Sequence, residues 1–445
     1  MNRPQPPVPT GGSSTLSVLR AAVTLALLFG MTWLSFRGVE PTLEDGRLAI
    51  LVGFVLLAAS LAGKLAAEVG VPRITGFILV GIVAGPSVFG LLPGAAVEDL
   101  RLIDEFALAL IAMLAGGELR LEALRPQART IALTTVVVTV IVWVGIALTV
   151  LAVRPFVPFL AELPLSAAVG IALLLGVWAA NSSPDLTVAV IEERHAQGTL
   201  PDVILGVTIA KDVLVIVLFT LTLALVTPLL EPDAAFEVGA LVELGREVGG
   251  AVVLGAALGW VFSAYLGKEG DRPRSPMATF LFAYVLVVVA SELHVELLLA
   301  GVAAGFTIEN LSPAGDRMIR GIRSVAVVVF AFFFAIAGAA LDLAAAARFG
   351  VAALVIFGAR VFFTRVGAMY GARISGADEP VRRLTWQGLI SQGGVSLGLV
   401  LLIGEAFPAV GPSVVALAMA VILGNILGGP ILLSRVLSQG EKEAH

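Results

Sequence analysis

The chain has 445 residues, of which 58% are hydrophobic and 14% are charged, and its mean hydropathy is +1.00. Soluble domains carry about 25% charged residues, so the composition excludes an ordinary soluble protein and predicts a surface solvated by lipid. The net charge of −5, with no basic cluster, excludes nucleic-acid binding. With no Cys and only three scattered His, disulfides and Cys- or His-based metal sites are excluded, and neither a cofactor nor an enzyme motif is expected.

The N-terminal segment 1–14 is rich in Pro, Gly and Ser and is predicted to be disordered in the cytoplasm. The next run is hydrophobic like a signal peptide, but it is long enough to span a bilayer and no A-x-A-like cleavage site follows it. We interpret it as the first of fourteen transmembrane helices in one domain over 15–437, followed by a tail at 438–445. The predicted spans are 15–36, 47–69, 74–92, 102–117, 130–153, 165–191, 201–229, 249–267, 275–291, 294–311, 321–342, 349–371, 383–405 and 411–436.

Basic residues are distributed unequally between the predicted loops. If the N-terminus is cytoplasmic, fourteen spans return the C-terminus to the cytoplasm. The cytoplasmic segments then hold nineteen of the 28 Lys and Arg residues, and the external loops hold six. This is the bias that the positive-inside rule requires. With the Ala-, Arg- and Gly-rich composition, it predicts a multi-pass protein of a bacterial inner membrane with both termini in the cytoplasm.

Three basic residues, Lys211, Arg360 and Arg365, fall inside the apolar runs. A charge at bilayer depth costs at least about 2.5–3.5 kcal/mol, so such residues are usually paired and functional. Arg365 lies nearer a predicted helix end, from which its side chain can reach the interface. Lys211 directly precedes Asp212, which lies about 16 Å into its span and therefore near the middle of the bilayer.

Two segments of the chain recur at a nearly constant offset. Residues 79–87 (LVGIVAGPS) resemble 299–307 (LAGVAAGFT) at an offset of 220, and 115–121 (AGGELRL) resemble 337–343 (AGAALDL) at an offset of 222. The matches predict two five-helix repeats of opposite orientation in the membrane, although shared Gly- and Ala-rich composition is an alternative explanation. Inverted repeats are typical of secondary transporters that work by alternating access. The predicted repeats cover about 74–229 and 294–436.

Helix-breaking residues interrupt the fourth span of each predicted repeat. The first break is Asn181-Ser-Ser-Pro-Asp185 and the second is Ser391-Gln-Gly-Gly-Val-Ser396. In lipid, unwound backbone survives only where it is buried in protein or lines a watery cavity. We predict that the two interrupted helices cross near the midplane and that their free carbonyls face an ion site. A simple kink, re-satisfied by Ser hydroxyls, is the alternative for either break alone.

These segments supply the oxygen ligands that a hard cation prefers. A carboxylate at this depth can also take up a proton, because desolvation disfavours its charged form. One carboxylate that holds either a proton or a cation is the minimal device for exchange, and a structural ion pair of Asp212 with Lys211 or Arg360 is the alternative. The candidate ion- or proton-binding residues are Asp212, Lys211, Asp185, Asn181, Ser182, Ser183 and Thr208, and those of the second break are Ser391, Gln392, Gly393 and Gly394.

From about residue 47 to 437 the chain resembles the monovalent cation:proton antiporter superfamily. It is nearest to the cation:proton antiporter-2 branch of Kef-type and Nap-type exchangers. The Gly-rich segment 75–87 is similar to the family's first repeat helix, and 114–121 (LAGGELRL) is similar to its GLELDL-like helix end. Ser182-Ser183 and Glu192-Glu193 stand at the family's unwound helix and the acidic end that follows it. Asp212 stands at the second acid of the family's ion-binding pair.

The resemblance implies a sodium/proton antiporter-like fold, a homodimer, and a core domain that moves against a dimerisation domain. It implies that Asp212 exchanges a proton for a monovalent cation. It also implies that Arg360 stands at a basic position that pairs with the site acid or stabilises the crossed helices.

One residue departs from the family pattern. The family's pair is usually Asp-Asp, Asn-Asp or Gln-Asp, whereas this chain has Lys211-Asp212. If Lys211 pairs with Asp212 or Asp185 and the cation displaces it, the protein is a secondary antiporter that exchanges Na⁺ or K⁺ for protons. If Lys211 blocks cation binding, the protein is an uncoupled ion or proton pathway, or a sensor. Adjacent helix residues point about 100° apart, so Lys211 can also face away from Asp212.

Overall fold

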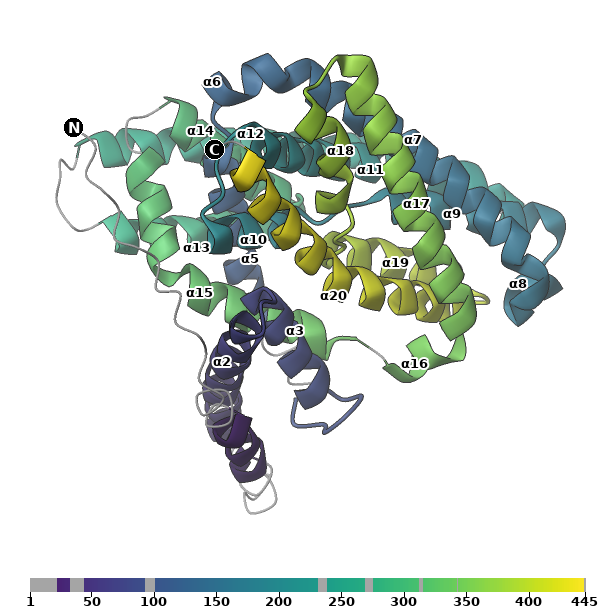
Figure 1. Cartoon of the computed structure of the whole chain (residues 1–445), viewed down its shortest axis with the longest axis horizontal. Helices are drawn as coiled ribbons and strands as arrows, with labels where there is room; N and C mark the ends of the chain where they lie inside the picture. Colours follow the sequence, from purple (N-terminus) through teal and green to yellow (C-terminus); the bar gives the residue numbers. More distant parts are fainter. Residues whose placement is uncertain are drawn as a thin grey trace.

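A computed structural model describes residues 22–32, 44–92, 101–230, 238–268, 275–311, 315–341 and 343–443. Within these ranges every regular element is a helix (Figure 1), and eight of the helices are long and apolar enough to cross a membrane. The prediction of an all-helical membrane protein is therefore confirmed. The predicted disordered segment 1–14 lies outside the described residues.

Each predicted span overlaps a helix, although the number of membrane crossings stays a prediction. A helix at Ala22–Thr32 falls within the first predicted span. The last helix continues to Glu443, so the predicted tail at 438–445 is helical over most of its length. The principal helices are α2 (Glu44–Glu68), α3 (Arg73–Ala84), α5 (Arg101–Glu118), α7 (Ala128–Val153), α9 (Leu165–Ala180), α10 (Pro184–Arg194), α11 (Thr199–Leu230), α12 (Val238–Lys268), α13 (Ser275–Leu293), α14 (Leu297–Leu311), α15 (Gly315–Ala339), α17 (Gly350–Ser375), α18 (Glu379–Gly388), α19 (Gly394–Ala406) and α20 (Gly411–Glu443).

The helices pack as two groups that lie side by side (Figure 1). One group, here called the crossing bundle, contains the interrupted helices α9–α10 and α18–α19 together with α7, α11, α17 and α20. Within it α7 packs along α17 and α9, and α9 packs on α11. The other group, the flanking bundle, contains α2, α3, α5, α12, α13, α14 and α15. Its main contacts are α5 with α14, α12 with α14, and α3 with α15.

Glycines allow two helix pairs of the flanking bundle to approach backbone to backbone. A Cβ at Gly116 of α5 would clash with the carbonyl of Val302 on α14, and a Cβ at Gly305 of α14 would clash with the carbonyl of Met113 on α5. In the same way, a Cβ at Gly81 of α3 would clash with the backbone of α15, and a Cβ at Gly338 of α15 would clash with the backbone of α3. Close packing through small residues is the usual way to hold helices together where lipid provides no hydrophobic drive.

Candidate ion-binding site

The two breaks contact each other at the centre of the crossing bundle. The Ser183 N–H donates to the Ser391 carbonyl at 2.9 Å, and the Ser182 hydroxyl donates to the Leu389 carbonyl at 2.7 Å. The indole N–H of Trp178 donates to the Ser396 carbonyl at 2.8 Å. These bonds replace helix bonds that the breaks remove, as buried backbone requires. The two interrupted helices therefore meet at their breaks.

Local sequence explains how the half-helix α10 begins. Ser183 is its N-cap, and the Ser183 hydroxyl accepts the Leu186 N–H at 3.2 Å. Pro184 follows at the first helical position, where a missing N–H costs nothing. Asp185 lies in the first turn, where the helix dipole favours a negative charge.

Arg360 of α17 is fully buried and binds both breaks through their carbonyls. Its guanidinium donates to Ala179 O at 2.7 Å and to Asn181 O at 2.6 Å on one break, and to Ile390 O at 2.6 Å on the other. It also donates to the Asn425 side chain of α20 at 2.7 Å. Arg360 therefore connects the two interrupted helices through hydrogen bonds to their carbonyls. Arg365, one turn further along α17, lies over the Trp386 ring at 5.6 Å.

Lys211 is also fully buried, but its amine has one hydrogen-bond partner. The Lys211 Nζ donates to the Ser182 hydroxyl at 2.7 Å. Within the described residues, neither Lys211 nor Arg360 lies within 4.0 Å of a carboxylate oxygen of Asp212 or Asp185. The structure therefore shows no ion pair between Asp212 and either basic residue. The 100° turn between adjacent helix residues separates the Lys211 amine from the Asp212 carboxylate.

Asp212 and Asp185 each have one oxygen without a hydrogen-bond partner. Both residues are 3% exposed, and the oxygens concerned are Oδ1 of Asp212 and Oδ2 of Asp185. The Ser183 hydroxyl donates to the other oxygen of Asp185. An unsatisfied carboxylate oxygen is costly in a buried site, so these atoms are the places where a proton or a cation would be stabilised. The hydroxyl of Ser391 is likewise buried without a partner.

Most of the remaining predicted site residues form hydrogen bonds or packing contacts within the two breaks. Asn181 accepts its neighbour's N–H and donates to the Ser396 hydroxyl at 3.2 Å. Gln392 donates weakly to the Trp178 carbonyl at 3.4 Å and accepts from Asn425 at 2.8 Å. Thr208 donates to Ile204 O of its own helix. Gly393 packs directly against the Asp185 carboxylate, whereas nothing lies within 4 Å of a Cβ placed on Gly394.

A cavity of about 610 Å³ opens between the two bundles and reaches Asp185. Its other acidic wall residues are Glu247 of α12 and Glu296, which immediately precedes α14. The rest of the wall is mostly apolar and includes Leu108, Phe219, Phe333 and Leu399. The cavity lies toward the ends of the helices that the charge bias predicts to be external. No group of three or more His, Cys, Asp or Glu residues within the described ranges is close enough to hold a metal ion.

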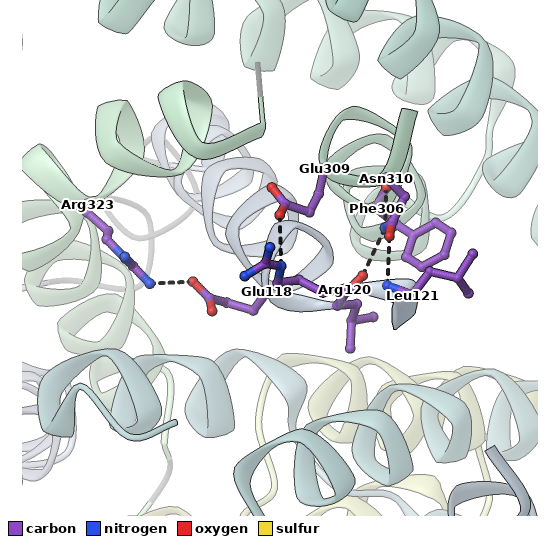
Figure 2. Close-up of polar contacts among 8 residues, drawn as sticks. Glu118, Arg120, Leu121, Phe306, Glu309, Asn310 and Arg323 are labelled. Carbon is purple, nitrogen blue, oxygen red and sulfur yellow. Dashed lines mark hydrogen bonds and ion pairs between the residues drawn. The ribbon is translucent and has the colours of Figure 1, made fainter. Parts of the chain in front are cut away.

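At the opposite ends, an ion pair and a hydrogen bond join the two bundles, and further ion pairs lie within the flanking bundle. Arg323 of α15 donates to Glu192 of α10 at 2.7 Å and to Glu118 of α5 at 2.6 Å. The Glu193 carboxylate accepts the Arg73 N–H at 2.9 Å, which ties α10 to α3. Figure 2 shows Arg323 with Glu118 beside a second pair, Arg120 with Glu309 at 3.4 Å. These contacts close the end that is predicted to be cytoplasmic.

Glu118 is the group of this closed end whose titration is most perturbed. It lies just beyond the predicted span 102–117. Burial raises the pKa of the Glu118 carboxyl from 4.5 to about 7, and the nearby Glu192 carboxylate adds to the rise, while Arg323 opposes it. The closed end therefore carries one carboxyl that titrates near neutral pH.

The profile of the family described as "Sodium/hydrogen exchanger, transmembrane" matches residues 53–439. The chain belongs to the sodium/hydrogen exchanger family. It is thus a member of a family of membrane transporters rather than of enzymes, as predicted. The membership confirms the resemblance at the level of the superfamily.

Two curated relatives of this exchanger-family chain are transporters. It is 24% identical over 357 residues to the "Na(+)/H(+)-K(+) antiporter GerN" of Bacillus cereus, which covers 78% of this chain and 85% of GerN. It is 24% identical over 299 residues to the "Iron transporter MagA" of Paramagnetospirillum magneticum, which covers 65% of this chain and 62% of MagA. The chain thus spans less than two thirds of the length of MagA.

Solved structures share the fold. The sodium proton antiporter MjNhaP1 of Methanocaldococcus jannaschii at pH 8 superposes with a TM-score of 0.66 and 17% identity, over 89% of this chain and 97% of MjNhaP1. An electron-microscopy map of the same antiporter gives a TM-score of 0.68 over 91% of this chain and 97% of MjNhaP1, again at 17% identity. The expected sodium/proton antiporter-like fold is supported by these matches.

Proposed function

We propose that this exchanger-family chain is a secondary antiporter that exchanges Na⁺ or K⁺ for protons, with Asp212 as the exchanging carboxylate. We place it nearest to the cation:proton antiporter-2 branch. The observation that carries the proposal is the state of Asp212, which is buried beside the contact between two helix breaks with one oxygen unpartnered. Because Lys211 is bound to Ser182, it leaves this carboxylate without an ion pair.

The chemistry at Asp212 is competition for one site. When the carboxylate is ionised, its unpartnered oxygen and the oxygens of the neighbouring break offer hard ligands to a monovalent cation. When it is protonated, the negative charge that holds the cation is gone. The cation and the proton therefore exclude each other, and movement of either across the membrane requires the return of the other.

Two equivalent sets of hydrogen bonds between the predicted repeats support the proposal that the repeats are inverted copies of one fold. Asn310, in the last turn of α14, donates to Leu119 O at 2.9 Å and accepts the Leu121 N–H at 2.7 Å (Figure 2). Ser87, which follows α3, donates to Leu341 O at 2.9 Å and accepts the Leu343 N–H at 3.1 Å. The two sets of backbone groups are 222 residues apart, which is the offset of the sequence repeat. A side chain of each predicted repeat thus forms hydrogen bonds with the equivalent turn of the other repeat.

The unequal ends of the molecule support alternating access. The cavity reaches Asp185 from the predicted external end, whereas the Arg323–Glu192 ion pair and the Glu193 hydrogen bond to Arg73 join the bundles at the predicted cytoplasmic end. The crossing bundle would then move against the flanking bundle, which closes the cavity and separates Arg323 from Glu192 and Glu193 from Arg73. The homodimer, the bacterial inner membrane and the cytoplasmic termini remain predictions from the sequence.

The proposal is tested with the purified protein in proteoliposomes that carry an imposed pH gradient. Addition of Na⁺ or K⁺ should collapse the gradient, measured with a pH-sensitive dye, while choline should not. The absence of any response to either cation between about pH 6 and 9 would reject exchange. Conductance that follows the electrochemical gradient without a counter-ion would favour the uncoupled pathway.

The role of Lys211 separates the two accounts of this site. Lys211→Asn removes the positive charge and restores the Asn-Asp pair that the resemblance describes. If Lys211 blocks cation binding, this variant gains exchange that the parent lacks. If the parent is already an antiporter, the variant exchanges as well and differs in cation affinity.

A further inference from the structure

The turn between α13 and α14 directs an acidic residue at the cavity. His294 has a left-handed backbone conformation with φ of 53°, and its N–H donates to Ser291 O at 3.2 Å. The Val295 N–H donates to Ala290 O at 3.0 Å, which turns the chain straight back into the bundle. Glu296 follows, half-buried on the cavity wall, and its carboxylate accepts the Leu299 N–H at the start of α14.

Glu296 is electrostatically close to Asp212 although the two residues belong to different bundles. Glu296, Asp185 and Lys211 are all near enough to act electrostatically on the Asp212 carboxylate. Glu296 and Asp185 line the same cavity. The negative charges around Asp212 thus outnumber the single nearby amine, and they come from both sides of the boundary between the bundles.

The buried basic side chains near these carboxylates are hydrogen-bonded to other groups. In a medium of low dielectric, neighbouring like charges repel strongly unless a positive charge or a proton compensates them. The two buried basic residues are engaged elsewhere, Lys211 by Ser182 and Arg360 by backbone carbonyls. The nearly buried Asp185 lines the cavity, and its Oδ2 has no partner. A monovalent cation in the cavity would relieve this repulsion.

We propose that Glu296 is a second cation-binding carboxylate of the exchange site, supplied by the flanking bundle to the cavity that Asp185 lines from the crossing bundle. The residue before Asp212 is Lys211, so the neighbouring position on α11 supplies no carboxylate. Glu296 supplies a second negative charge from another helix. Because the two carboxylates belong to different bundles, movement of the bundles changes the affinity for the cation. The identity of the ion rests on the proposed function.

The test compares Glu296→Gln with Glu292→Gln in the same turn. Gln retains an acceptor for the Leu299 N–H, so the cap of α14 is preserved. Glu292 is exposed and is not among the cavity-lining residues, which makes it the matched control. In proteoliposomes, Glu296→Gln should raise the half-saturating Na⁺ or K⁺ concentration about tenfold with the maximal rate largely kept, and Glu292→Gln should change neither.

A second measurement detects cation binding independently of transport. NaCl or KCl should raise the melting temperature of the parent protein in detergent relative to choline chloride at the same ionic strength, because a ligand that binds only the folded state stabilises it. Glu296→Gln should need about tenfold more salt for the same rise. This arm reports on Glu296 even if the parent shows no exchange, in which case the proposed function fails separately.

Unchanged half-saturation and unchanged salt-dependent melting in Glu296→Gln would overturn the proposal. That result, combined with exchange in the parent, would leave the proposed function intact and confine cation binding to the crossing bundle. An equal loss in Glu292→Gln would also overturn it, because the effect would then come from the charge of the turn as a whole.

Discussion

The buried basic side chains on the two sides of the helix crossing differ in their hydrogen bonding. On the α17 side, Arg360 donates to carbonyls of both breaks and to Asn425, and its short bonds leave the guanidinium well satisfied. On the α11 side, Lys211 has a single hydroxyl partner, and unpartnered oxygens remain at Asp212 and Asp185. A fully satisfied polar network makes a rigid scaffold, whereas unsatisfied oxygens leave a site for a ligand. We therefore assign a structural role to the side of Arg360 and ion exchange to the side of Asp212 and Asp185.

The largest expected effect is loss of the scaffold in Arg360→Leu. The variant leaves the carbonyls of Ala179, Asn181 and Ile390 without their donor in a buried site. Hydrogen bonds to charged groups are worth about 1.5–3 kcal/mol each, so the loss should reach roughly 4 kcal/mol or more. A large fall in melting temperature, with little folded protein recovered, is expected by fluorescence-detected size exclusion.

Arg365→Leu is the control on the same helix. Arg365 is exposed and contacts the Trp386 ring, an interaction worth about 0.5–1 kcal/mol at such sites. If both Arg variants destabilise equally, the Arg360 bonds are not what holds the crossing together.

The second prediction concerns Gly393, which lies against the exchange side. A Cβ at this position would lie 2.5 Å from the Ser183 hydroxyl and 2.9 Å from Asp185 Oδ2. Gly393→Ala should therefore displace the Asp185 carboxylate and lower the exchange rate by about tenfold or more. Gly394→Ala adds the same methyl group where nothing lies within 4 Å, and it should exchange normally. Equal rates in the two variants, measured by dye-detected exchange, would show that the position of Asp185 is unimportant.

A third prediction is that Lys211 contributes far less to stability than Arg360. Lys211→Met keeps the length of the side chain and removes one hydrogen bond, while also removing the cost of burying an amine. The expected change in the free energy of unfolding is within about 1.5 kcal/mol. A collapse of stability as large as that of Arg360→Leu would make Lys211 part of the scaffold and erase the difference between the two sides.

The smallest effect is expected at the closed end, away from both sides of the crossing. The folded protein holds the Glu118 proton more tightly than the unfolded chain, because burial raises this pKa from 4.5 to about 7. The stabilising contribution of Glu118 is thus present at low pH and lost as the pH rises from about 4.5 to 7. Glu118→Gln carries no such proton, so its melting temperature should fall less than that of the parent between pH 5 and 8. An identical pH dependence in both proteins would contradict the assignment, and cation half-saturation should not change.

The sequence predicted the helices and the position of both breaks because these depend on local composition. Apolar runs of spanning length define the helices, and Pro184 with Gly393 and Gly394 interrupts two of them in the middle. The direction of long side chains depends instead on tertiary partners. That Lys211 turns to Ser182, and that Arg360 reaches Asn425, required the packing of helices distant in sequence.

The charged residues between the bundles carry little local sequence signal of their partners. Arg323 lies among other basic residues near a predicted cytoplasmic end, and nothing local distinguishes it from a solvated charge. Its pairing with Glu118 and Glu192 joins helices more than a hundred residues apart. The sequence equally allows Glu296 to line an external entrance or to lie at a solvated helix end, and only the fold brings it near Asp212. A helix break with oxygen-bearing side chains can be recognised from sequence alone. An acidic residue that reaches the same site from another bundle cannot.

The central claim, that Asp212 carries the exchange, is tested most directly by measuring cation and proton fluxes together in proteoliposomes with the parent and Asp212→Asn. Asn has nearly the same shape but cannot ionise, so the fold should be retained, as judged by an unchanged melting temperature. The account predicts coupled and opposite fluxes of Na⁺ or K⁺ and protons in the parent, and neither flux above empty liposomes in Asp212→Asn. Full coupled exchange in the folded variant would contradict the account and place the exchanging carboxylate elsewhere.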